Sequence, residues 1–421
     1  MGMTIAEKIL ARASGKAQVK PGEIVNARVD VAMSHENADV VRRHFEQIGI
    51  GRVWDPDKIV ILFDHRIPAE SEKTAITHKV LREFVKKHEI KNFYDMKVGI
   101  CHQILPEKGH VRPGEVLVGT DSHTTTHGAF GTFATGIGAT DMAGVWATGE
   151  IWLKVPETIK IEVTGTFREW VSAKDLILHI IGKLGADGAD YKAVEFHGAT
   201  IREMSVASRM VLSNLSMEMG AKVAFVLPDE RTIEYVKTRT SKPFEIVLPD
   251  DDAAYEKSLA VDVSELEPQI ACPHAVDNVK PIGEVKGIKI HQALIGSCTN
   301  GRLEDLEVAA KLLTHKLVHS DVRLLVIPAS WEVYLEAMKK GYLEVFIRAG
   351  ALIVNPGCGP CLGAHQGILA PGERCISSTN RNFRGRMGSP DSEVYLASPA
   401  VVAASAIQGE IADPRTTDEY G

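Results

Sequence analysis

The chain has 421 residues, of which 44% are hydrophobic and 24% charged. This composition is typical of a globular protein and excludes long disordered tracts, while the length predicts two or three domains. The net charge of -7 argues against non-specific binding to nucleic acid or to an anionic membrane. The apolar runs are too short to span a bilayer and no secretory signal is found, so we expect a cytoplasmic protein.

Apolar, β-branched runs alternate with helical patterns along the chain, which predicts an α/β fold. The runs expected to form strands are 58–63, 116–118, 160–164, 291–295 and 352–354. Helices are expected at 71–87, with Ile76, Val80 and Phe84 on one stripe, at 205–220, and from Leu303, with Leu306, Ala310 and Leu313 on one face. The pattern changes between about 156 and 281, so we expect three α/β domains, at 1–157, 158–280 and 281–421.

Polar side chains collect where these predicted strands end. Asp64 and His65 follow the first strand, and Asp121, Ser122 and His123 follow the second. Later strands lead into the loops 296–300 and 355–358. Open α/β sheets place their ligand crevices at this edge, so we expect the loops to converge on one cleft.

Six cysteines in a chain without a secretory signal are not expected to form a disulfide framework. Cys101, Cys272 and Cys375 stand alone, and we expect each to be a small buried hydrophobe. The other three cysteines lie in two glycine-rich loops.

Cys298 lies in a Gly-Ser-Cys-Thr-Asn loop, and Cys358 and Cys361 form a Cys-x-x-Cys flanked by glycines. Zinc sites, thiol redox pairs and iron–sulfur clusters all use such a motif, and spacing alone leaves the three open. Structural zinc normally takes four protein ligands, and the sequence offers no second motif to supply a fourth. A [4Fe–4S] cube held by three cysteines leaves one iron free as a Lewis acid, and the flanking glycines would let the backbone approach its sulfides.

Six motifs, in order along nearly the whole chain, closely resemble those of the aconitase superfamily, and in particular the separate large subunits of 3-isopropylmalate dehydratase and homoaconitase. They are Phe-Asp-His at 63–65, Cys-His-Gln at 101–103, Gly-Thr-Asp-Ser-His-Thr at 119–124, Gly-Ser-Cys-Thr-Asn at 296–300, the loop 357–363, and Ser-Thr-Asn-Arg-Asn-Phe-Arg-Gly-Arg at 378–386. The resemblance implies a three-domain core with α/β/α layers and a cleft between domains. In that cleft it implies a [4Fe–4S] cluster on Cys298, Cys358 and Cys361, with one iron not ligated by protein.

The reaction implied by the resemblance is the isomerisation of 2-isopropylmalate and 3-isopropylmalate by dehydration and rehydration, a step of leucine biosynthesis. Homoaconitase and a methylmalate-type dehydratase are the alternatives. Such chemistry needs a proton donor for the departing hydroxide, and a histidine beside a carboxylate provides one. The resemblance pairs Asp64 with His65, Asp121 with His102, and Glu218 with His123, and we expect His65 to be the donor.

Arginine binds carboxylates bidentately, which suits Arg381 and Arg386 to a small polycarboxylate substrate. The resemblance adds Asn380, Ser122, Asn214 and His35 as substrate-binding residues. Asn214 and Glu218 lie four apart in the predicted helix 205–220, so both can face the same cleft. No role is assigned to Arg384, His127, His274 or His365.

Single-chain aconitases have a further mobile domain that carries a catalytic serine, and its Ser-Ser-Arg motif is not found here. We therefore expect activity only with a small partner subunit that supplies this domain and selects the substrate. An RNA-binding regulator is a second hypothesis, which the short chain and negative charge disfavour. A zinc or thiol redox enzyme built on Cys358 and Cys361 is a third.

Overall fold

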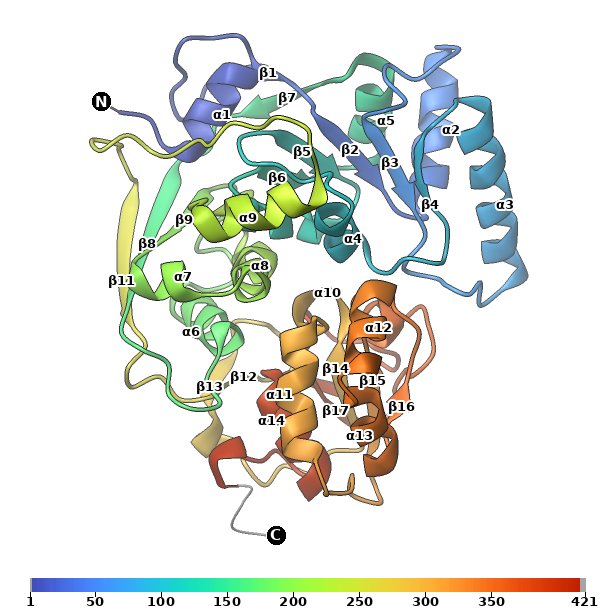
Figure 1. Cartoon of the computed structure of the whole chain (residues 1–421), viewed down its shortest axis with the longest axis vertical. Coiled ribbons are helices and arrows are strands. Elements are labelled where there is room, and N and C mark those ends of the chain that lie inside the picture. Colours follow the sequence, from blue (N-terminus) through green and yellow to red (C-terminus); the bar gives the residue numbers. More distant parts are fainter. Residues whose placement is uncertain (1, 417–421) are drawn as a thin grey trace.

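The structure is a computed structural model that describes residues 2–416. Its first large sheet lies at the upper right of Figure 1, in blue to cyan. All neighbouring strands of this sheet run parallel, in the order β4 (Asn92–Tyr94), β3 (Ile59–Leu62), β2 (Val31–Ser34), β5 (Val116–Gly119) and β6 (Phe133–Gly136). The intervening helices are α2 (Ala38–Ile48), α3 (Glu72–Lys87), α4 (Cys101–Glu107), the 3-10 helix η1 (Ser122–Phe130) and, after β6, α5 (Ala139–Thr148).

The central strands of this sheet are buried on both faces, which explains why they read as unbroken apolar runs. In β3, Ile59 and Ile61 pack into one hydrophobic cluster, while Val60 and Leu62 pack into another. An antiparallel ribbon of β1 (Ile24–Arg28) and β7 (Glu150–Lys154) accompanies the sheet, together with the N-terminal helix α1 (Ile5–Ala13).

The second sheet is also parallel. Its strands follow the order β10 (Val223–Val226), β9 (Ala193–His197), β8 (Thr158–Thr164) and β11 (Lys257–Asp262). The helices of this region are α6 (Ala173–Leu184), α7 (Ala199–Glu203), α8 (Val206–Leu215), the 3-10 helix η2 (Ser216–Met219) and α9 (Glu230–Arg239). Residues of this region that reach the site come from α6, α8 and η2.

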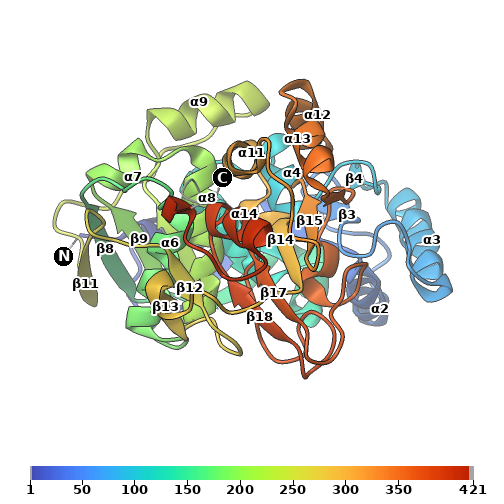
Figure 2. The same ribbon diagram turned by 90° about the horizontal axis from the view of Figure 1, so that it is seen from below.

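The third sheet lies below the first in Figure 1, in orange to red. Its order is β13 (Val279–Pro281), β12 (Gln269–Ala271), β18 (Glu393–Leu396), β17 (Arg374–Ser377), β14 (Gln292–Gly296), β15 (Arg323–Ile327) and β16 (Leu352–Ile353), and only the pairs made by β12 are antiparallel. The helical elements are η3 (Ile282–Glu284), α10 (Ser297–Asn300), α11 (Leu303–Leu313), α12 (Trp331–Lys339), α13 (Tyr342–Ala349), η4 (Gly359–Leu362) and α14 (Pro399–Gln408). Figure 2 shows α11 beside α14.

The predicted α/β class is confirmed, and the five predicted strands match β3, β5, β8, β14 and β16. Because β12 and the start of β13 lie before residue 281 and belong to the third sheet, that sheet starts earlier in the chain than the predicted third domain. The division into three domains stays a prediction. Within residues 2–416, no helix has the length and apolar character needed to cross a bilayer.

Two helix predictions need correction. The buried side chains of α3 are Thr74, His78, Leu81, Phe84 and Val85, whereas Ile76 is 55% exposed. The inward face is therefore offset from the predicted stripe, because the His78 ring stacks on Phe63 at 4.2 Å. The helix predicted at 205–220 ends at Leu215 and continues as the 3-10 turn η2, which carries Glu218.

Backbone hydrogen bonds join the loops at the carboxyl edges of the first and third sheets. The Cys358 amide donates to the Asp64 carbonyl at 2.9 Å, and the Ile100 amide donates to the Ala329 carbonyl at 2.9 Å. The Trp331 amide donates to the Val98 carbonyl at 2.8 Å. These bonds bring the predicted histidine and cysteine loops into contact.

Candidate active site

Three buried cysteines lie in two loops of the third sheet. Cys298 is in α10, directly after β14, while Cys358 and Cys361 lie at the start of η4 and within it, beyond β16. The three residues are 4%, 6% and 2% exposed, respectively. Burial raises the pKa of the Cys298 thiol to about 11, so binding a metal requires displacing its proton.

Two asparagine side chains contact these sulfurs. Asn380 Nδ2 lies 3.3 Å from the Cys298 Sγ, and Asn380 Oδ1 lies 3.4 Å from the Cys361 Sγ. Asn214 Nδ2 lies 3.5 Å from the Cys298 Sγ. Both asparagines were expected to bind substrate, and in the structure they pack against the cysteines, where an amide N–H would stabilise thiolate charge.

The spacing of the thiols fits a group larger than one ion. Ligands at about 2.3 Å around a tetrahedral zinc would lie within about 4 Å of one another. Among the described residues, the group with all ligand atoms within 4.8 Å is His35, Glu36, Asp64 and His65, and the three cysteines form no such group. The Cys358 and Cys361 thiols are close enough to hydrogen-bond, but the three sulfurs do not all lie together as the ligands of one ion would. Three buried cysteines on two loops are a donor set that an iron–sulfur cluster can use.

Glycines fit the thiol loop closely against its protein surroundings. A Cβ on Gly359, whose φ is +60°, would lie 2.1 Å from the Ile327 Cδ1. A Cβ on Gly357 would lie 2.8 Å from the Asp64 carbonyl oxygen. The sequence suggested that these glycines let the backbone approach inorganic sulfides; the structure shows that packing against β15 and the Asp64 loop already requires them.

Asp64 and His65 follow β3 and are both buried. The His65 Nδ1 lies 2.5 Å from the Asp64 Oδ1, and the Cys101 amide at the start of α4 donates to the Asp64 Oδ2 at 2.7 Å. The His35 ring stacks on the His65 ring with centroids 4.1 Å apart. The imidazole of His65 is therefore fixed in position by contacts on its edge and its face.

Asp121 lies at the centre of three histidines. Its carboxylate is 2.8 Å from the His102 Nε2, 3.5 Å from the His65 Nε2 and 3.7 Å from the His123 Nδ1. The backbone amide of His123 also donates to the Asp121 Oδ1 at 2.8 Å. One carboxylate thus links residues from three loops of the first sheet.

These contacts shift the histidine pKa values in different directions. Burial opposes the charged form of His65, but the Asp64 and Asp121 carboxylates outweigh it and raise the pKa well above the usual value. The pKa of His123 is also raised, since the Asp121 and Glu218 carboxylates outweigh the effect of its burial. Burial prevails at His102 and lowers its pKa despite the Asp121 bond. Near neutral pH, His65 is therefore charged and His102 neutral.

The second region contributes Glu218 from η2. The Glu218 Oε1 lies 2.7 Å from the His123 Nε2 and accepts from the Arg381 Nε at 2.8 Å. Glu218 is 6% exposed, so it is not a solvated helix residue. The three histidine–carboxylate pairs expected from the sequence are thus in contact, and Arg381 joins one of them.

The remaining predicted substrate-binding residues, Arg386 and Ser122, have fewer hydrogen bonds to other side chains. The Arg386 Nε is buried and has no hydrogen-bond partner among residues 2–416, whereas Arg384 is exposed. The pKa of the Cys361 thiol is held well below its usual value, first by a hydrogen bond from Cys358 and also by the charge of Arg386. Ser122 is half-buried at the start of η1.

The unassigned histidines lie in different settings. His127 is fully buried, and neither ring nitrogen has a partner within the described part of the chain. The His365 Nε2 bonds the Ile67 carbonyl at 2.7 Å, which ties the cysteine loop to the Asp64 loop. His274 forms an isolated bridge with Phe383 in the arginine loop. The lone cysteines Cys101, Cys272 and Cys375 are all buried.

Three charged residues that support the site went unassigned in the sequence. Glu36 accepts from the amides of Asp64, His65 and Arg66 at 2.9–3.2 Å and so anchors the loop of the proposed acid.

Lys174 and Arg302 anchor the cysteine side of the site. The Lys174 ammonium donates to the Ser378 and Thr379 carbonyls at 2.9 and 2.5 Å. Arg302 donates to the Cys298 and Thr299 carbonyls at 2.9 and 2.8 Å. The sequence signal for Glu36 and Arg302 is that each lies next to residues with a predicted role. The sequence around Lys174 gives no such signal, because nothing there distinguishes it from a solvated lysine.

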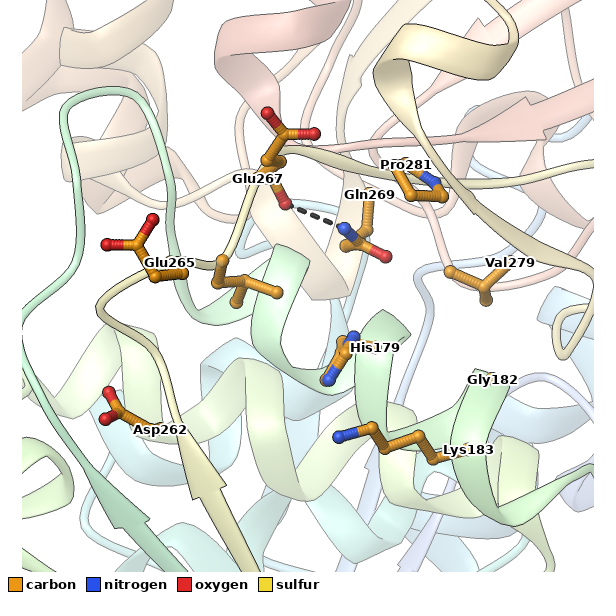
Figure 3. A pocket seen from close by; sticks show the side chains of 10 residues that line it. His179, Gly182, Lys183, Asp262, Glu265, Glu267, Gln269, Val279 and Pro281 are labelled. Carbon is orange, nitrogen blue, oxygen red and sulfur yellow. Dashed lines mark hydrogen bonds between the residues drawn. The ribbon is translucent and has the colours of Figure 1, made fainter.

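Cavity size does not identify this site. A cavity of about 600 Å³ lies away from it, between α6 and the segment 262–281, where Figure 3 shows His179, Lys183 and several acidic side chains. A cavity of about 500 Å³ adjoins the site and is lined by Asp121 and Ser122 on one side and by Tyr191 and Lys222 on the other.

Comparisons with known proteins agree with this geometry. A family model described as the aconitase family (aconitate hydratase) matches residues 23–287 and 280–409. The 3-isopropylmalate dehydratase large subunit 1 of Methanopyrus kandleri is 60% identical over 99% of each chain. The probable methanogen homoaconitase large subunit of Methanothermobacter thermautotrophicus is 55% identical over 98% of each chain.

A solved structure, the aconitase X of Thermococcus kodakaraensis in its holo-form, aligns with 84% of each chain at 13% identity and a TM-score of 0.48. The family match and the two relatives confirm the resemblance that the six motifs indicated. The chain therefore belongs to the aconitase family, which implies an iron–sulfur cluster.

Proposed function

We propose that this chain is the large subunit of a 3-isopropylmalate dehydratase, a hydro-lyase that interconverts 2-isopropylmalate and 3-isopropylmalate. Relatives of that name are between 51% and 60% identical over nearly their whole length. The observation that carries the proposal is the meeting of two loops: the Cys358 amide bonds the carbonyl of Asp64, whose carboxylate holds His65. A set of thiols and a charged proton donor thus adjoin one another.

Cys298, Cys358 and Cys361 would hold a [4Fe–4S] cluster that has one iron without a protein ligand. Such a cluster, when bound, supplies a Lewis acid for the substrate hydroxyl and carboxylate. The fit rests on the burial of the three sulfurs, on their not lying together as one ion would require, and on the asparagine amides beside them.

His65 would donate the proton to the departing hydroxyl. Its raised pKa keeps it charged near neutral pH, and Asp64 and Asp121 hold both ring nitrogens, so the imidazolium is oriented before substrate enters. When water is added back, the neutral ring would recover a proton from it. His102, which burial keeps neutral, and His123 would orient the substrate and water.

The arginine loop would bind the substrate carboxylates. The Arg386 Nε is buried without a partner in the described chain, and such a donor is costly unless a ligand satisfies it. Arg381 is oriented by Glu218, which fixes its guanidinium for bidentate binding. Asn380, Ser122 and His35 would make further substrate contacts.

The large-subunit names of the relatives support a small partner subunit, which would close over the cleft and supply the base for the carbon-bound proton. We place the complex in the cytoplasm and expect no binding to nucleic acid. Homoaconitase is the alternative activity, because a relative of that name is 55% identical.

The test is to assemble the cluster anaerobically and assay the chain with and without its small subunit on 3-isopropylmalate, homoaconitate and 2-methylmalate. We expect turnover of 3-isopropylmalate only in the two-subunit complex, with iron and sulfide near four each per chain. Preference for homoaconitate would assign the alternative activity. Zinc in place of iron, or turnover by the chain alone, would contradict the proposal.

A further inference from the structure

Figures 1 and 2 show α6, α8, α11 and α14 near one another. Residues at or beside these helices line a cavity of about 260 Å³, which none of the histidines, cysteines or arginines of the proposed site lines. Its volume is at the lower end for small-molecule sites, so it suits a ligand of few heavy atoms. Its apolar wall consists of Trp170, Val171, Val211, Val308 and Pro399. No residue proposed above for the reaction lines it.

Two residues that line this cavity carry a buried polar atom without a partner among residues 2–416: the Ser398 Oγ and the Asn300 Oδ1. Ser398 is 1% exposed and Asn300 is 3% exposed. Buried oxygens without a partner are costly, so each indicates a hydrogen-bonding ligand or bound solvent. The Asn300 Nδ2 donates to the Asp305 Oδ1 at 2.9 Å, which fixes Oδ1 as the free acceptor.

The Ser398 end of the cavity favours a carboxylate. Ser398 is the N-cap of α14, yet its side chain does not cap the helix. The first helical residue, Pro399, has no N–H, so the hydroxyl of Ser398 and the amides of Ala400 and Val401 remain as donors. Lys174 also lines the cavity, and its ammonium uses two of its three donors on the Ser378 and Thr379 carbonyls.

The Asn300 end favours a cation. Beside its free carbonyl oxygen lie the carboxylates of Asp305 and Glu304, which also line the cavity. Glu304 Oε1 accepts from the hydroxyls of Ser205 and Ser208 at 2.9 Å, which holds its charge at the cavity wall. An ammonium group would satisfy the Asn300 oxygen and offset this negative charge.

We infer that this cavity binds a free α-amino acid with an apolar side chain. Its carboxylate lies at Ser398 and the start of α14, its ammonium lies at Asn300, and its side chain packs on the valines. Asn300 ends the helix that carries Cys298, and Lys174 holds the backbone next to Asn380. An amino acid bound here therefore contacts the residue that ends the Cys298 helix and the lysine that holds the arginine loop.

Calorimetric titration of the full chain with L-valine, L-leucine and L-phenylalanine tests binding directly and does not depend on the proposed reaction. We expect saturable binding of at least one of them. Leucinamide lacks the carboxylate and 4-methylpentanoate lacks the ammonium, so each should bind at least about tenfold more weakly than leucine. Absence of saturable binding below about 10 mM, or equal binding of these analogues, overturns the inference.

Ser398→Ala removes a hydroxyl that makes no hydrogen bond in the described chain, so the variant should fold normally and bind the amino acid about tenfold more weakly. Val308→Trp fills the cavity and should abolish binding. Ser320→Ala, an exposed serine, is the matched control and should leave affinity unchanged. Undiminished binding to both cavity variants would place the ligand elsewhere and overturn the assignment.

Discussion

The histidine loops of the first sheet and the cysteine loops of the third sheet are joined by backbone hydrogen bonds but are built differently. His65, His102 and His123 each lie within 2.5–2.8 Å of a carboxylate, so these polar groups already satisfy one another. The thiols of Cys298 and Cys361 have longer contacts, with asparagine side chains at 3.3–3.5 Å, and burial raises the pKa of Cys298. The histidine–carboxylate pairs are thus held in place by protein contacts, whereas the proposed cluster would complete the surroundings of the thiols.

The largest effect should come from removing a thiol. Cys298→Ser should lose most of the bound iron and reduce turnover below detection, because a hydroxyl is a poor ligand for iron–sulfur clusters. Iron analysis and visible absorption after anaerobic assembly measure this. Cys375→Ser, which changes another buried cysteine, is the control and should retain the cluster. Equal iron loss in both variants would mean that folding, not ligation, was damaged.

Substitutions in the His65–Asp64 pair should leave the cluster intact. His65→Gln removes the charged donor and should lower kcat by about 10²–10⁴-fold with unchanged iron content. Asp64→Asn should have a similar effect, since it removes the charge that keeps His65 protonated. Turnover close to that of the unaltered enzyme in both variants would assign the proton donor to another residue.

A smaller effect is expected in the arginine loop. Arg381→Lys should raise KM for the substrate by about 10–100-fold, because lysine cannot reproduce a bidentate contact. Arg384→Lys is a matched control three residues away, and its exposed side chain predicts no change. Steady-state kinetics with measured cluster content separates the two. Loss of cluster in Arg381→Lys would indicate a structural role.

The opposite pKa shifts of His65 and His102 predict opposite pH dependences of stability. The pKa of His65 is 6.5 in the unfolded chain and higher in the folded chain. The stability that follows from this difference is fully present below pH 6.5 and is lost as pH rises through the folded-state pKa. The advantage of the unaltered chain over His65→Gln in thermal unfolding should therefore shrink with rising pH. The lowered pKa of His102 predicts the reverse. The advantage of the unaltered chain over His102→Gln in thermal unfolding should grow as pH rises toward 6.5. Parallel trends would contradict the assigned charges.

The smallest expected effect is on the stability of the chain, and it distinguishes the exposed face of α3 from the buried one. Ile76→Ala should change the free energy of unfolding by about 0.5 kcal/mol or less, because the side chain is mostly exposed. Leu81→Ala, on the buried face, should cost about 2–5 kcal/mol. Urea denaturation measures both. A larger loss at Ile76 would support the stripe expected from the sequence.

Sequence reasoning succeeded where strand order dictates position. Parallel strands of one sheet present their carboxyl ends at one edge, so the residues after β3 and β5 could be expected to converge. That the loops of the third sheet meet them depends on how the two sheets face each other. It failed for α3, because Ile76, Val80 and Phe84 have helical spacing as good as that of the face that packs inward. Only the position of Phe63 under His78 decides between the two faces.

The supporting charges could not be found from local patterns. Lys174 and Arg302 lie at helix starts, where charged residues are usually solvated, yet they are 0% and 4% exposed. Their partners are backbone carbonyls of loops that only the assembled fold brings near. Glu218 was expected on a regular helix and instead lies on a tighter turn, which still directs it toward His123.

Asp64 makes three different contacts, one through each of its oxygens. One carboxylate oxygen holds His65, the other caps α4 at the Cys101 amide, and the carbonyl accepts the Cys358 amide. A shift of this single residue would tilt the imidazole and displace the thiol loop together. The distance between the proposed acid and the proposed cluster is thereby set by one short stretch of main chain, so we expect substitutions on either loop to be tolerated only if they leave that stretch in place.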